Sequence, residues 1–227
     1  MATGLIVALD VPNANQIPDV VKKLPAEVSF YKVGLELYTA AGPAALTYLK
    51  DAGKQVFLDL KLHDIPRTVA RSVESATTLG VDLLTVHACG GRAMLEAATE
   101  AAKDRLNIVA VTVLTSLDQS DLASIGVQRA LREHILALGK LAIDSGVPGL
   151  VCSPLETRSF RETLGQEPIL ITPGIRPAGA EAGDQKRIAT PAMAAADGSS
   201  YIVVGRPILE ASNPGLAAEQ ILAELAP

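Results

Sequence analysis

The sequence predicts a (β/α)8 barrel, the TIM-barrel architecture, formed by a single domain that spans residues 1–227. Three observations support this fold class. Eight short apolar runs recur about every 20–35 residues, segments with helical spacing of apolar residues separate them, and the runs are continuous rather than alternating. Continuous runs are typical of parallel strands that are covered on both faces. A chain of 227 residues is long enough to bury one large core.

The eight predicted strands are rich in Val, Ile and Leu, and clear helical periodicity appears in four of the segments between them. The strands are Leu5–Leu9, Ser29–Val33, Gln55–Leu60, Leu83–Val86, Ile108–Val113, Gly149–Cys152, Ile169–Thr172 and Tyr201–Val204. The four helical segments are Val69–Leu79, Ala93–Ala102, Leu131–Asp144 and Leu216–Leu225. A doubly wound open sheet is the alternative. That fold usually carries Gly-x-Gly-x-x-Gly after its first strand, whereas Asp10-Val-Pro-Asn stands here.

The composition is that of a globular protein with an aliphatic core. Hydrophobic residues make up 48% and charged residues 20% of the chain, which has three Phe, four Tyr and no Trp. With so few aromatic rings and a net charge of −5, we expect no nucleic-acid partner. An anionic small molecule remains possible, provided that Lys and Arg gather locally at its site.

The sequence also predicts a cytoplasmic protein without a membrane partner. The two cysteines, Cys89 and Cys152, lie far apart, and the chain enters an apolar strand at Leu5 without a basic leader or cleavage site. Charges or prolines interrupt every apolar run before it reaches the roughly 18–20 residues that span a bilayer. We expect both cysteines to be buried thiols without a catalytic role.

Residues 57–68, Phe-Leu-Asp-Leu-Lys-Leu-His-Asp-Ile-Pro-Arg-Thr, are the most informative segment of the chain. Successive side chains of a strand alternate between its faces, so Asp59 and Lys61 share one face while leucines occupy the other. Burying such a pair costs several kcal/mol per ion and gives no advantage in stability over apolar residues, which favours a chemical role. The alternative is a surface ion pair on a solvated edge strand.

Polar residues follow almost every predicted strand. Active sites of (β/α)8 barrels lie at the C-terminal ends of the strands, so these residues should converge on one rim. They are Asp10, Lys32, Asp59, Lys61, His87, Thr115, Ser116, Ser153, Arg176 and Arg206. Together with Asp64, this rim has an alternating set of aspartates and lysines, which predicts catalytic roles for Lys61, Asp59, Lys32 and Asp64.

The loops after the seventh and eighth strands have the features of a phosphate site, which is common at this place in such barrels. Gly205 allows close backbone approach, Arg206 has a planar fork that fits phosphate oxygens, and Pro207 suits a helix start. A helix start with a surface arginine is the alternative. The loop of residues 173–190 is long enough to form a lid. Its cationic and amide side chains are Arg176, Gln185, Lys186 and Arg187.

These motifs, in this order, resemble the orotidine 5′-phosphate decarboxylase family from Asp10 to Arg206. The motifs are Asp59-Leu-Lys-Leu-His-Asp-Ile-Pro-Arg-Thr68, Val-Leu-Thr115-Ser, Thr-Pro-Gly-Ile-Arg176 and Val-Gly205-Arg-Pro-Ile. Related barrels with Asp-x-Lys-x-x-Asp include magnesium-dependent sugar-phosphate aldolases and decarboxylases. Those barrels lack the Asp-Ile-Pro-x-Thr continuation that this chain carries.

The resemblance implies decarboxylation of orotidine 5′-monophosphate to uridine 5′-monophosphate, the last step of de novo pyrimidine synthesis, with no cofactor and no metal. Lys61 would stabilise the charge that develops at C6 of the base and deliver the proton. Asp59, Lys32 and Asp64 would hold Lys61 charged and in position. Asp59 would also lie against the substrate, near the departing carboxylate.

The resemblance also implies binding roles and a homodimer with shared active sites. Asp10 and Lys32 would bind the ribose hydroxyls, and Thr115 would lie near the base. Asp64 and Thr68 would reach into the site of the neighbouring subunit. The phosphate would be held by Arg176, Gln185, Gly205 and Arg206.

Two other functions remain open from the sequence. One is a magnesium-dependent sugar-phosphate aldolase or decarboxylase of the same barrel type, and the other is a catalytically silent phosphate-binding barrel. His63 and His87 are candidate metal ligands, because histidine often binds metals. With three histidines in the chain and no His-x-x-x-His spacing, we expect packing roles for them and no metal site.

Overall fold

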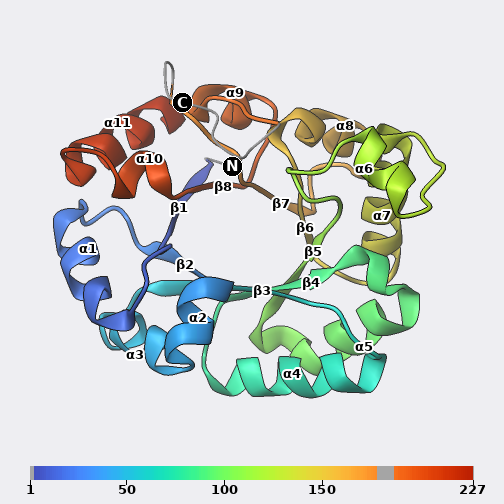
Figure 1. The fold of residues 1–227 in the computed structure, drawn as a ribbon, viewed down its shortest axis with the longest axis horizontal. Coiled ribbons are helices and arrows are strands. Elements are labelled where there is room, and N and C mark those ends of the chain that lie inside the picture. The colour runs from blue at the N-terminus through green and yellow to red at the C-terminus, as the bar shows by residue number, and fades with distance from the viewer. Residues whose placement is uncertain (1–2, 178–186, 227) are drawn as a thin grey trace.

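A computed structural model, which describes residues 3–177 and 187–226, is a closed barrel of eight parallel strands surrounded by helices (Figure 1). The strands follow one another around the barrel in chain order, and β8 pairs with β1 to close it. The predicted (β/α)8 barrel is therefore confirmed, and the open-sheet alternative is wrong. Closure also removes sheet edges, so β3 lies between β2 and β4 and is not the solvated edge strand of the alternative interpretation.

The observed strands match the predicted ones to within two residues at each end. They are β1 Gly4–Ala8, β2 Phe30–Gly34, β3 Gln55–Leu62, β4 Leu83–His87, β5 Asn107–Val111, β6 Gly149–Val151, β7 Ile169–Thr172 and β8 Tyr201–Val204. The largest differences are that β3 continues to Leu62 and that β5 ends before Val113. Val113 instead follows the end of β5 and lines the cavity described below.

Helices connect successive strands and cover the outside of the barrel. They are α1 Ile17–Lys23, α2 Leu35–Ala41, α3 Ala44–Asp51, α4 Pro66–Thr78, α5 Arg92–Ala102, α6 Gln119–Ser124, α7 Leu131–Asp144, α8 Pro154–Leu164, α9 Pro191–Ala196, α10 Arg206–Leu209 and α11 Pro214–Leu225. Several begin with proline after a capping side chain; Ser153 and Glu156 form a capping box at the start of α8. No helix within the described residues is both long and apolar enough to cross a membrane.

The core has two parts that meet at the sheet. The larger part packs between the strands and the helices, and the smaller part fills the barrel interior. The interior residues are Ile6, Ala8, Phe30, Phe57, Leu83, Val109, Ile171 and Val203. Both faces of every strand are thus buried, which explains why the apolar runs in the sequence are continuous.

Strand periodicity carries this interior pattern to the site. Side chains two residues apart lie on the same face of a strand, so the residues that follow Ala8, Phe30 and Phe57 by two positions also face the barrel axis. Those residues are Asp10, Lys32 and Asp59. The charged residues converge because each continues an inward-facing apolar row at the C-terminal end of its strand.

The narrow interior leaves little room for a side chain at Gly149 of β6. A Cβ atom at Gly149 would lie 2.6 Å from the carbonyl oxygen of Ile169 and 3.1 Å from Cγ1 of Val109. We predict that Gly149→Ala lowers the free energy of unfolding by about 1–3 kcal/mol, because the neighbouring strands must move apart. Urea unfolding measures this loss, and an unchanged midpoint would show that the barrel absorbs the methyl group.

Candidate active site

A cavity of about 310 Å³ opens at the C-terminal ends of the strands. Its polar lining comes from strands on all sides of the barrel, and valines with Phe57 and Cys152 form an apolar wall. The polar and charged residues are Asp10, Lys32, Asp59, Lys61, Thr115, Ser116, Arg176 and Arg206. The structure thus brings together most of the residues that the sequence predicted for the site.

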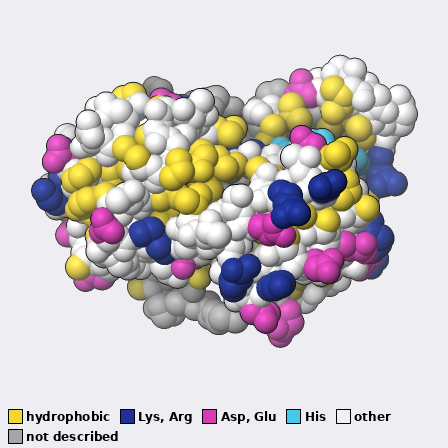
Figure 2. All heavy atoms as spheres, turned by 90° about the horizontal axis from the view of Figure 1, so that it is seen from below, with side chains coloured by type: hydrophobic (Ala, Val, Ile, Leu, Met, Phe, Trp, Pro, Cys, Tyr) yellow, Lys and Arg dark blue, Asp and Glu magenta, His cyan; other side chains and the backbone are white. Residues whose placement is uncertain are grey.

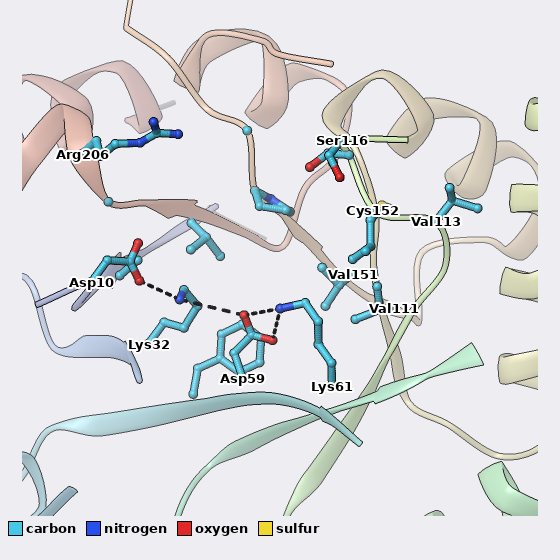
Figure 3. Close-up of a pocket in the computed structure, with 18 of the residues that line it drawn as sticks. Asp10, Lys32, Asp59, Lys61, Val111, Val113, Ser116, Val151, Cys152 and Arg206 are labelled. Carbon is cyan, nitrogen blue, oxygen red and sulfur yellow. Dashed lines mark hydrogen bonds and ion pairs between the residues drawn. The ribbon is translucent and has the colours of Figure 1, made fainter. Parts of the chain in front are cut away.

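Four charged side chains form a continuous row across one side of the cavity (Figure 3). Nζ of Lys32 lies 3.1 Å from Oδ1 of Asp10 and 3.9 Å from Oδ2 of Asp59. Both carboxylate oxygens of Asp59 accept hydrogen bonds of 2.8 Å from Nζ of Lys61. Negative and positive groups alternate along the row, so each lysine ammonium lies against a carboxylate that holds it in place.

The inner part of this row is largely withdrawn from solvent. The side chains of Lys32 and Asp59 are each 13% exposed and that of Lys61 is 27% exposed. Desolvating such groups costs several kcal/mol per ion, and attraction between them offsets this cost only in part. Apolar residues would therefore stabilise the fold at least as well as this charged row, which supports a role for the row in binding or chemistry.

The backbone at Lys61 has an unusual conformation. Its φ angle is +53°, in the left-handed region that residues other than glycine rarely adopt, at a cost of about 1–3 kcal/mol. The ladder between β3 and β4 is irregular at the same point, since Leu58 pairs with Leu84 and Leu62 with Val86. Three residues of β3 therefore lie opposite a single residue of β4, a bulge that directs Lys61 into the cavity.

That single opposite residue is Thr85, which sequence analysis missed. Its hydroxyl accepts a hydrogen bond of 2.7 Å from the backbone N–H of Lys61 and donates one of 3.0 Å to Oδ1 of Asp59. A hydroxyl inside the apolar run Leu-Leu-Thr-Val was the available signal, because buried polar side chains require partners. The partners themselves could not be read from the sequence, since they depend on the bulge.

Two arginines follow β7 and β8, which lie opposite β3 and β4 in the closed barrel and thus on the side of the cavity away from Lys61. Figure 3 shows Arg206 across the cavity from Lys61, at the start of α10, and Arg176 follows β7 on the same rim. A Cβ atom at Gly205 would lie 3.0 Å from Oδ2 of Asp10 and 3.3 Å from Cβ of Ala8. Glycine at this position therefore leaves room for the Asp10 carboxylate, where the ends of β8 and β1 meet.

Arg187, the last cationic residue of the 173–190 loop, makes structural contacts with α8 and with the segment after β5. It pairs with Glu156 at the start of α8 and donates hydrogen bonds to the carbonyl oxygens of Val113 and Leu114, at 3.2 and 2.8 Å. Burial lowers the pKa of its guanidinium from the usual value. Arg187 thus joins the loop to the end of β5.

Three predicted site residues are not placed in the cavity. Asp64 and Thr68 are exposed near the start of α4, and neither is among the described residues that line the cavity. The Asp64 carboxylate accepts a hydrogen bond of 2.7 Å from the N–H of Ile65. Gln185 lies outside the described residues, as does much of the proposed lid, residues 173–190. Their roles stay predictions.

Neither the cysteines nor the histidines near the cavity have features that indicate a catalytic role. Burial raises the pKa of Cys152 to about 12, so its thiol stays neutral and is a poor nucleophile at pH 7. The prediction of a buried thiol is wrong for Cys89, which is exposed on the short 3-10 helix after β4, where Ala88 instead turns its side chain into the core. No three His, Cys, Asp or Glu side chains of residues 3–177 and 187–226 gather as metal ligands would.

His87, at the end of β4, has a pKa below the ordinary value for histidine. Burial is the main cause of its lowered pKa, and the nearby His63 and Lys61 lower it further, while Asp59 opposes them. The imidazole rings of the two histidines lie 5.7 Å apart.

We predict that His87 makes the protein less stable in mild acid. As the pH falls below 6.5, the ordinary value for histidine, the unfolded chain binds a proton at His87 before the folded chain does, so stability is lost. His87→Gln should therefore reduce the fall in unfolding free energy between pH 7.5 and 5.5, as measured by urea titration. An equal fall in the variant would contradict the prediction.

The chain is similar throughout its length to known decarboxylases. Residues 3–221 match the model of the "Orotidine 5'-phosphate decarboxylase / HUMPS family". A protein of Opitutus terrae named orotidine 5'-phosphate decarboxylase is 48% identical over 99% of both chains. One of Rhodopseudomonas palustris with the same name is 52% identical over 98% of this chain and 94% of its own. The solved structure of the Lactobacillus acidophilus orotidine 5'-phosphate decarboxylase has a TM-score of 0.88 and 39% identity, covering 99% of this chain and all of that one.

Proposed function

The chain belongs to the orotidine 5′-phosphate decarboxylase / HUMPS family, and from this premise we propose that it converts orotidine 5′-monophosphate to uridine 5′-monophosphate and carbon dioxide. This is the last step of de novo pyrimidine synthesis. The observation that carries the proposal is the Lys61 ammonium, fixed by both oxygens of Asp59 in a cavity with arginines on the far side. A cation at one end and a phosphate-binding group at the other suit a nucleotide monophosphate.

In the proposed reaction, the bond between C6 of the pyrimidine and its carboxylate breaks and carbon dioxide leaves. The electron pair stays at C6 in the plane of the ring, where the ring π system cannot delocalise it. The Lys61 ammonium stabilises this developing charge and then transfers one proton to C6, which completes uridine 5′-monophosphate. Solvent returns a proton to the neutral lysine.

Asp59 has two proposed roles. It holds the Lys61 ammonium with two hydrogen bonds of 2.8 Å, so little reorganisation is needed as charge develops. Its carboxylate would also lie close to the substrate carboxylate, and repulsion between them would be relieved as carbon dioxide leaves. Lys32, between Asp10 and Asp59, continues the row and keeps both carboxylates in position.

The remaining cavity residues would bind the parts of the substrate that do not react. Asp10 and Lys32 suit the ribose hydroxyls, and Thr115 suits the edge of the base. Arg176, Gly205 and Arg206 suit the phosphate, together with Gln185. Binding energy from the phosphate can be used to hold the base against Lys61, which lowers the barrier rather than only the Michaelis constant.

The proposed chemistry uses no cofactor or metal, and an assay in excess EDTA tests the function directly. We expect the purified protein to deplete the ultraviolet absorbance of orotidine 5′-monophosphate at full rate in EDTA. Absence of decay, with activity on a sugar phosphate that magnesium restores, would assign the chain to the magnesium-dependent alternative. Binding of the nucleotide without turnover of either substrate would identify a silent phosphate-binding barrel.

Lys61→Ala should lower kcat by about 10³-fold or more, because the variant loses both the charge stabilisation and the proton donor. Steady-state rates of orotidine 5′-monophosphate loss measure this effect, and circular dichroism checks the fold. Lys140→Ala is a suitable control, since Lys140 pairs with Asp144 on the surface of α7. A residual rate within about tenfold of wild type would remove Lys61 from the proton-donor role.

We also propose a homodimer in which each active site receives Asp64 and Thr68 from the neighbouring subunit. The segment that carries them is exposed, and Ile65 within it is 67% exposed. Figure 2 views the molecule from below Figure 1, the side on which α4 lies, and shows hydrophobic side chains gathered on its left half. An exposed apolar side chain next to Asp64, on a side of the molecule that also carries a gathered hydrophobic surface, supports an interface between two copies of the chain.

Mixing two inactive variants tests the shared sites. In a heterodimer of Lys61→Ala and Asp64→Ala, one site lacks both side chains and the other has both. If the sites are shared, an equal mixture that exchanges subunits should regain about a quarter of the wild-type turnover, because half of the dimers hold one intact site of two. If each chain uses its own Asp64, no intact site forms and the mixture stays inactive.

The proposed setting is the cytoplasm, where the nucleotide substrate would be available. The far-separated cysteines and the net charge of −5 support this setting and the absence of a nucleic-acid partner.

A further inference from the structure

Thr85 lies beneath the charged row, out of reach of the substrate. It belongs to β4, where Leu83 faces the barrel interior and Leu84 and Val86 pack against the helices. The alternation of the strand therefore turns Thr85 inward. Its side chain is completely buried, and it is absent from the described residues that line the cavity.

The bulge in β3 determines what Thr85 contacts. Between Leu58 and Leu62 the regular ladder with β4 is interrupted, so the backbone of Lys61 has no regular ladder partner there. The left-handed φ of +53° instead directs the Lys61 N–H to the hydroxyl oxygen of Thr85, at 2.7 Å. A side-chain oxygen thus replaces the missing carbonyl partner.

The direction of both hydrogen bonds follows from the groups involved. A backbone N–H can only donate, so the oxygen of Thr85 accepts from Lys61. An ionised carboxylate can only accept, so the single hydroxyl proton of Thr85 goes to Oδ1 of Asp59, at 3.0 Å. One hydroxyl therefore ties the backbone of Lys61 to the carboxylate that also holds the Lys61 ammonium.

We propose that Thr85 is a positioning residue for the decarboxylation, an inference that rests on the proposed function. It fixes the backbone of Lys61 in the left-handed conformation and fixes the Asp59 carboxylate in the orientation that aims the ammonium at C6. A hydroxyl is required because any apolar side chain of the same shape leaves a buried N–H and a carboxylate oxygen without this partner. The effect should concern the transition state more than substrate binding.

Thr85→Val and Thr85→Ser separate the hydroxyl from the shape of the side chain. Thr172→Val is the matched control, because Thr172 is also a completely buried strand threonine, and its hydroxyl bonds to that of Ser199, away from the charged row. We expect Thr85→Val to lower kcat by about 10- to 100-fold, since small misplacements of reacting groups have effects of this size. The Michaelis constant should stay within about twofold of wild type.

Thr85→Ser should restore most of kcat, and Thr172→Val should keep kcat even if it destabilises the fold. The inference is wrong if Thr85→Val retains wild-type kcat, if Thr85→Ser is equally impaired, or if Thr172→Val loses kcat to the same extent. Failure of the wild-type protein to decarboxylate orotidine 5′-monophosphate would overturn the proposed function itself. It would be recognised before any variant is compared.

Hydrogen exchange of the Lys61 amide in the wild-type protein gives a readout that needs no variant. Protection comparable to that of the neighbouring strand amides is expected, because the bond to Thr85 is buried. Exchange as fast as that of an exposed loop amide would overturn the proposed contact, even if Thr85→Val does not fold.

Discussion

The ion pair between Asp59 and Lys61 is the interaction on which the rest of the site depends. Two charges two residues apart on an interior strand face must be paired with each other or with further charges, because neither can be left alone in a low-dielectric interior. Lys32 and Asp10 extend the pair to the edge of the cavity, where water solvates the half-exposed carboxylate of Asp10. The row is therefore one alternating electrostatic unit, and its geometry is set by three neighbouring strands of a rigid barrel.

Much of this architecture follows from local sequence. Strand runs, their parity and the rule that barrel sites lie at the C-terminal ends were enough to predict the barrel and to place Asp10, Lys32, Asp59 and Lys61 on one rim. For Asp10, Lys32 and Asp59 the predictions succeed because inward-facing positions repeat every two residues, and each of these residues continues an apolar row that is already inward. Lys61 also reaches the rim, but through the bulge in β3. The arginines after β7 and β8 follow from the same rule.

The rest depends on non-local geometry that the sequence pattern does not encode. Thr85 becomes important only because β3 bulges opposite it, and a bulge depends on the pairing of two strands rather than on either strand alone. Likewise, the sequence shows Arg187 only as one cation of the predicted lid, whereas in the structure it contacts Glu156 at the start of α8 and Leu114 after β5. Asp64 and Thr68 fall outside the cavity of the single chain, and their predicted roles concern a second copy of it.

The site combines residues from β1 and β8, which are made at very different times during protein synthesis. Asp10 is translated long before Gly205 and Arg206, which complete the same rim. A nascent chain without β8 can contain the whole charged row and still lack a closed barrel and one arginine of the far wall. Competence to act on a substrate thus arises only after β8 and Arg206 have been made, so a translation product that ends before β8 lacks a complete site.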